Sequence, residues 1–132
     1  MPPPLGFGLV TGGWTLPVPL QRIEGVAILL GSIWLFTQTG QSWWLFALLL
    51  LMPDLGMVGY LAGPRLGAVS YNLTHTLVAP LGLLALAALV DHSMPIALAA
   101  IWGAHIGMDR ALGYGLKHAS GFKDTHLGRI AP

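Results

Sequence analysis

The chain has 132 residues, of which 55% are hydrophobic and only 8% are charged. Soluble domains carry about 25% charged residues, so this composition excludes a water-covered surface and indicates one integral membrane domain. A net charge of +1 gives no reason to expect nucleic-acid binding, and the absence of cysteine excludes disulfides and thiolate metal sites.

Residues 1–20 are predicted to be an irregular lead-in, because Pro and Gly recur through them. They lack the basic start of a signal peptide. Four apolar stretches follow, each about long enough to cross a bilayer. They cover residues 22–39, 42–62, 67–90 and 95–112.

Short connections between these stretches force neighbours to be antiparallel. The sequence therefore predicts an all-α polytopic membrane protein over residues 21–112, an antiparallel bundle of four transmembrane helices. Pro53 and Pro80 fall inside the second and third spans and should kink them. Gly-rich faces on the second and fourth spans, Gly56 to Gly63 and Gly103 to Gly107, favour close helix packing and, more weakly, a homo-oligomer.

The basic residues decide the expected orientation. With four spans, all six lie on the side of the two termini and the second loop: Arg22, Arg65, Arg110, Lys117, Lys123 and Arg129. Positively charged loops stay in the cytoplasm, so both termini are predicted to be cytoplasmic. Residues 113–132 then form a basic cytoplasmic tail after Gly113 and Gly115 end the last helix. This tail either follows the lipid surface or folds back over the spans.

Ionisable residues inside the spans are the main functional signal, since burying charge in a bilayer is costly. At about 1.5 Å rise per residue, Glu24, Asp54, His75, His105 and Asp109 lie about 5–12 Å from the cytoplasmic ends of their helices. His105 and Asp109 also share one helix face. We expect these five side chains, from four helices, to meet in one cluster.

Imidazole and carboxylate groups together suit Zn²⁺, Mn²⁺ or Fe²⁺. The predicted metal ligands are His75, His105, Asp109 and Asp54. Glu24 and Asp54 are the predicted catalytic carboxylates, with Glu24 as general base. Supporting residues around the ligands would be Tyr71, Asn72 and Arg110. A metal-free polar network is an equal alternative, and a haem held by the two histidines is a third.

Two strings carry a family resemblance, MPDLGMVGYLAGPRLGAVSYNLTHT and IWGAHIGMDRALGYGLKHASGFKDTHLG. They resemble the bacterial membrane-protein family known as domain of unknown function 4260, over roughly residues 22–128. The resemblance implies a small multi-span protein of the bacterial cytoplasmic membrane and no established activity. The family's motif residues map onto Glu24, Asp54, Tyr60, Tyr71, Asn72, His75, His105, Asp109, Arg110, Tyr114 and Lys117.

The cluster is also loosely similar to membrane-embedded metal-dependent hydrolases, which gather His and Asp from several helices near one membrane face. We therefore hypothesise a metal-dependent hydrolase that acts on a lipid or amphiphile from the cytoplasmic leaflet. The alternatives are a small-solute or proton carrier, with Asp54, His75 and Asp109 as a relay, and a haem-binding electron carrier. Membrane lipids are the expected partners.

Overall fold

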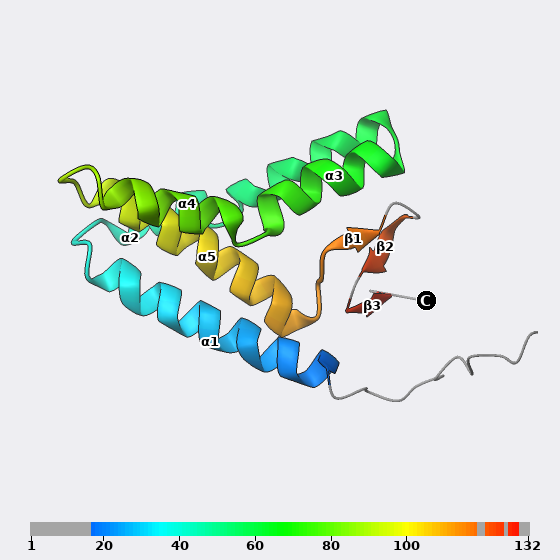
Figure 1. Cartoon of the computed structure of the whole chain (residues 1–132), viewed down its shortest axis with the longest axis horizontal. Coiled ribbons are helices and arrows are strands. Elements are labelled where there is room, and N and C mark those ends of the chain that lie inside the picture. Colours follow the sequence, from blue (N-terminus) through cyan, green and yellow to red (C-terminus); the bar gives the residue numbers. More distant parts are fainter. Residues whose placement is uncertain (1–16, 119–120, 126, 130–132) are drawn as a thin grey trace, which may run out of the picture.

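The computed structural model describes residues 17–118, 121–125 and 127–129 (Figure 1). Five α-helices, one 3₁₀-helix and three short strands follow one another along the described chain. The helices are α1 (Pro17–Thr37), α2 (Trp43–Leu49), η1 (Met52–Ala62), α3 (Pro64–His75), α4 (Val78–Ala87) and α5 (Met94–Leu112). The strands are β1 (Lys117–His118), β2 (Gly121–Thr125) and β3 (Gly128–Arg129).

The first helix begins earlier than expected. Residues 1–16 of the predicted irregular segment lie outside the described residues, but Pro17 already starts α1. Proline is favoured in the first turn of a helix, because its missing N–H would have no partner there. The prolines at positions 17 and 19 therefore open the helix and do not break it.

Helices α1 and α5 run antiparallel and nearly in backbone contact. A Cβ atom added to Gly107 would lie 2.5 Å from the backbone nitrogen of Leu29, and one added to Gly25 would lie 2.5 Å from that of Ala111. The Arg22 Nε donates to the Ala111 carbonyl at 2.9 Å, joining the start of α1 to the end of α5. The predicted use of small residues for close packing is confirmed at Gly107, within the chain itself.

The second predicted span changes helix type at Pro53. Helix α2 ends at Leu49, and η1 continues the segment as a 3₁₀-helix to Ala62. A 3₁₀-helix has three residues per turn, so residues at every third position share an edge. Gly56 and Gly59 occupy such an edge and lie against α3, where an added Cβ on either would come within 2.8 Å of a backbone oxygen.

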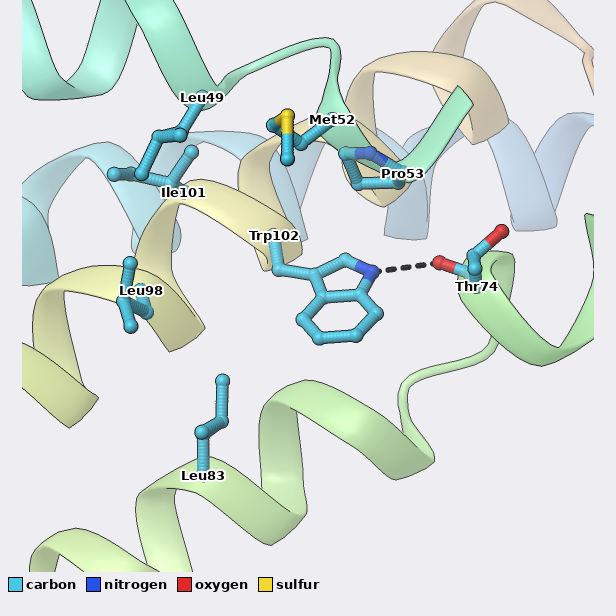
Figure 2. A pocket seen from close by; sticks show the side chains of 8 residues that line it. All are labelled: Leu49, Met52, Pro53, Thr74, Leu83, Leu98, Ile101 and Trp102. Atoms are coloured by element: carbon cyan, nitrogen blue, oxygen red, sulfur yellow. Dashed lines mark hydrogen bonds between the residues drawn. The ribbon is translucent and has the colours of Figure 1, made fainter. Parts of the chain in front are cut away.

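The third predicted span is broken four residues before Pro80. Helix α3 ends at His75, Thr76 adopts an extended conformation (φ −92°, ψ 155°), and α4 starts at Val78. A proline ring clashes with the carbonyl four positions earlier, which here belongs to Thr76. The predicted kink is thus present one turn earlier. The neighbouring Thr74 carbonyl accepts a hydrogen bond from the Trp102 Nε1 at 2.6 Å (Figure 2).

The tail departs from the all-α prediction. Its three strands form a small antiparallel sheet in the order β1-β2-β3. Strands β1 and β2 contact α3, so this part of the tail folds back onto the helices. Gly113, at φ 85°, ends α5 as predicted, and the Tyr114 N–H bonds the Asp109 carbonyl at 2.7 Å. The helical class therefore holds for the described chain up to residue 112.

Within the described part of the chain, three helical segments are long and apolar enough to cross a membrane. They cover Val18–Thr37, Trp43–Ala62 and Pro64–Ala87. Large apolar side chains such as Trp34 and Leu61 are exposed on them, as expected for helices that face lipid. Helix α5 lies between α1 and α4 (Figure 1), also contacts α2, and buries ten of its residues. It is the central helix of the structure.

Candidate metal centre

Four side chains from three helices converge beside the C-terminal half of α5. Their donor atoms are Asp54 Oδ1, His75 Nε2, His105 Nε2 and Asp109 Oδ2, and we call this group the four-residue centre. The two Nε2 atoms lie 3.1 Å apart. Each Nε2 is 3.2–3.3 Å from one oxygen of each carboxylate. None of the separations within the group exceeds 4.8 Å.

The helix breaks place these side chains. Asp54 follows Pro53 in the first turn of η1, and His75 is the last residue of α3 before the break at Thr76. His105 and Asp109 stand one turn apart on α5, as the sequence spacing predicts. Two interrupted helices therefore present one ligand each to a continuous helix that carries two.

Three of the four side chains in the centre are almost completely buried. The side chains of His75, His105 and Asp109 are 4%, 1% and 11% exposed, whereas that of Asp54 is 32% exposed. Buried ionisable groups need close partners, because solvation by water is lost. The exposure of Asp54 marks the side on which a small molecule could reach the centre.

The orientation of the His75 ring is fixed by its other nitrogen. Its Nδ1 lies 2.8 Å from the Tyr71 carbonyl oxygen, which can only accept, so Nδ1 carries the proton. In a neutral ring the Nε2 lone pair then points at the centre. This backbone contact from the far nitrogen is the arrangement that orients metal-binding histidines. The Tyr71 ring stacks on the same imidazole, with centroids 3.7 Å apart and planes 9° apart.

Hydrogen bonding alone does not satisfy these contacts. Each Nε2 has three close neighbours but carries either one hydrogen or one lone pair, so it forms one good bond. Protonating both Nε2 atoms would bring two N–H groups together at 3.1 Å. A cation in the middle accepts all four lone pairs at once. A tetrahedral ion with ligands at about 2.0–2.1 Å holds them about 3.3 Å apart, close to five separations observed here.

A haem does not fit the two histidines. Axial ligands approach iron from opposite faces of a porphyrin, and this macrocycle has to lie between them. At 3.1 Å, with carboxylate oxygens beside both Nε2 atoms, no space is left for it.

The remaining predicted residues take different places. Glu24 is exposed on α1 and is not in the four-residue centre, although its charge acts on Arg110. Arg110 is half-buried beside Asp109 and Tyr71, and the Tyr71 hydroxyl approaches Asp109 Oδ2 at 3.4 Å. Asn72 is half-buried one turn before His75 and lies outside the centre.

Sequence reasoning missed two neighbours of the centre. The Thr74 hydroxyl donates to the Tyr71 carbonyl at 2.9 Å and lies 2.9 Å from His75 Nδ1. Trp102 satisfies the Thr74 carbonyl that the helix break releases. The signal for Trp102 was available, because it is three residues before His105 on α5 and so points to a similar side.

Comparison with known proteins places the chain in a family. No curated protein and no solved structure matches it. The sequence matches one family over residues 19–130, which covers most of the chain and includes all of the four-residue centre. The protein therefore belongs to the family described as Domain of unknown function (DUF4260).

Proposed function

We propose that the four-residue centre binds one divalent transition metal, and that the protein is a membrane hydrolase that uses this metal. The carrying observation is the set of five donor separations of 3.1–3.3 Å around a common point. Two imidazoles and two carboxylates favour Zn²⁺, Mn²⁺ or Fe²⁺.

Hydrolysis would use the open side of the centre. A divalent metal lowers the pKa of a bound water and supplies hydroxide at neutral pH. Asp54 is the ligand on the exposed side, and the carboxylate oxygen outside the centre would accept the water's proton. Glu24 has no part in this scheme, since it lies on the exposed surface of α1.

We further propose that the protein crosses the membrane four times and that α5 is the fourth span. Its 19 residues match the bilayer thickness, and the other helices cover it, so it needs less apolar surface of its own. The loops at the far end meet, because the Gln41 side chain donates to the Ser93 hydroxyl at 3.0 Å. The basic residues at the opposite end favour cytoplasmic termini.

A carrier is less well supported than an enzyme. A relay needs polar groups that continue to the other membrane face. Toward the loop end, the face of α5 that bears His105 continues with Ile101 and Leu98, which are apolar. The polar path therefore stops at the centre.

Metal analysis of the purified full-length protein tests the proposal. We expect about one transition-metal ion per chain in the wild type and a loss of at least about tenfold in His105→Ala, because outer-sphere changes alone cost 10–100-fold. Glu24→Gln is the matched control, since it removes a carboxylate outside the centre, and should keep the metal. Wild-type protein without metal after growth in supplemented medium would contradict the proposal. Equal content in the His105→Ala variant would place the metal elsewhere.

A further inference from the structure

An apolar pocket of about 440 Å³ lies among the helices that carry the four-residue centre (Figure 2). Its size falls in the range of about 300–1,000 Å³ that small-molecule sites occupy. Residues from α2, η1, α4 and α5 line it, together with Thr74 from the end of α3. They are Leu49, Met52, Pro53, Thr74, Leu83, Leu98, Ile101 and Trp102.

Several residues that line the pocket are sequence neighbours of residues in the centre. Pro53 precedes Asp54, and Thr74 precedes His75. Ile101 lies one helical turn before His105 on α5, so the same side of this helix lines first the pocket and then the centre. A molecule that fills the pocket would thus have one end near the metal ligands.

The wall of the pocket selects for hydrocarbon. The Trp102 Nε1 is already bonded to the Thr74 carbonyl, as the dashed line in Figure 2 marks. The Thr74 hydroxyl donates to the Tyr71 carbonyl. The polar groups of the pocket are therefore satisfied within the protein. A polar ligand would lose its hydration there without new hydrogen bonds, whereas an alkyl chain loses nothing.

The surrounding bilayer can supply such a chain. Met52 lines the pocket and is 49% exposed, and the neighbouring Leu51 is 60% exposed. Methionine is flexible and unbranched, so its side chain can move to admit a chain from the side. The entry would be from the lipid phase.

We propose that this pocket binds one alkyl chain of an amphiphile and so places the polar end of that molecule at the four-residue centre. This inference rests on the proposed function for the role of the bound molecule, but chain binding itself does not require the metal. It assigns the substrate class as a lipid with at least one unbranched hydrocarbon chain.

Photolabelling of the full-length protein tests the assignment. The probe is a palmitic acid analogue with a diazirine near its terminal methyl group, applied in detergent micelles and followed by peptide mapping. We expect labelling concentrated on the α5 segment with Leu98 and Trp102, and its removal by excess unlabelled palmitic acid. Bulk lipid contact would label the outward-facing residues, such as Leu61 at 90% exposure, and would not saturate.

Two matched variants on α4 test whether the alkyl chain binds in this pocket. Leu83→Trp fills the pocket, and we expect the α5 labelling to fall about tenfold. Leu81→Trp adds the same ring at a position that is 59% exposed, and should leave the labelling unchanged. Equal labelling in the two variants would overturn the proposal. If Leu83→Trp fails to fold, unsaturable labelling of the wild type overturns it independently.

The two proposals fail separately. Metal content is measured on the same preparations. Saturable labelling without metal would contradict the hydrolase and keep the chain-binding pocket. Stoichiometric metal without saturable labelling would keep the metal centre and contradict the pocket.

Discussion

Replacing Gly107 by alanine should separate α1 from α5. The added Cβ would lie 2.5 Å from the Leu29 nitrogen and 2.8 Å from the Gly25 oxygen, whereas ordinary contacts begin at 3.4 Å. Both neighbours are backbone atoms, so the helices have to move apart by about 1 Å, and overpacking of this kind costs about 1–3 kcal/mol. Against this, alanine gains up to about 1 kcal/mol over glycine in a helix.

Gly31→Ala is the control for this substitution. Gly31 lies in α1 with nothing within 4 Å of its added Cβ, so this variant has the helix gain without the clash. The free energies of unfolding should differ by about 1–3 kcal/mol, with Gly107→Ala the less stable. Equilibrium unfolding in mixed micelles measures the difference. Equal stabilities would refute the close packing of α1 on α5, and a loss of metal from Gly107→Ala would show that its effect reaches the centre.

One treatment, with a chelator, and two further variants test the centre and its surroundings. Chelator treatment should lower the free energy of unfolding by about 2.7 kcal/mol if free metal was at 100 times its dissociation constant, and thermal unfolding of treated and untreated protein measures it. Asp109→Asn should abolish this difference, and a chelator effect that persists in the variant would contradict the ligand assignment. Trp102→Phe leaves the Thr74 carbonyl without its donor and should cost about 1–3 kcal/mol by the same unfolding assay, with metal content unchanged. No measurable cost would mean that water or lipid satisfies this carbonyl.

Depth along a helix was enough to predict much of the centre. Counting residues from the helix ends grouped Asp54 with His75, His105 and Asp109, and the structure brings these four together. The same count included Glu24, which lies on the exposed surface of α1. Depth does not specify which way a side chain points around the helix axis. His105 and Asp109 are one turn apart, so their shared helix face also indicated the direction in which both side chains point. Glu24 has no such polar partner on α1, so its direction could not be predicted.

The course of the backbone was harder to predict than the site. The segment Pro53–Ala62 has small residues at every third position, a spacing that matches a 3₁₀-helix. That pattern is also compatible with an α-helix that packs through glycines, which is the structure that the sequence predicts. Both helix types place Gly56 and Gly59 on one face, and in the structure that face lies against α3. Similarly, the strands that follow α5 are too short to give a periodic signal.

The two helix breaks explain why the centre lies where it does. Interrupted helices expose carbonyl groups, and within a membrane these need partners from the protein. Here the groups that supply them also build the site. At the second break Trp102 bonds the released Thr74 carbonyl and forms a wall of the pocket, while within the last turn of α3 His75 Nδ1 bonds the Tyr71 carbonyl and is thereby held with Nε2 toward the centre.

The cost of the second break is thus offset in part by the Trp102 hydrogen bond, and the same indole shapes the pocket. A continuous α-helix through Thr76 would bond the Thr74 carbonyl internally, to the Val78 N–H, and would leave the Trp102 Nε1 to find another acceptor. The break that ends α3 at His75 falls at Thr76, four residues before Pro80, where the proline ring would clash with the carbonyl of a continuous helix. The site is a property of interrupted helices packed on a continuous one.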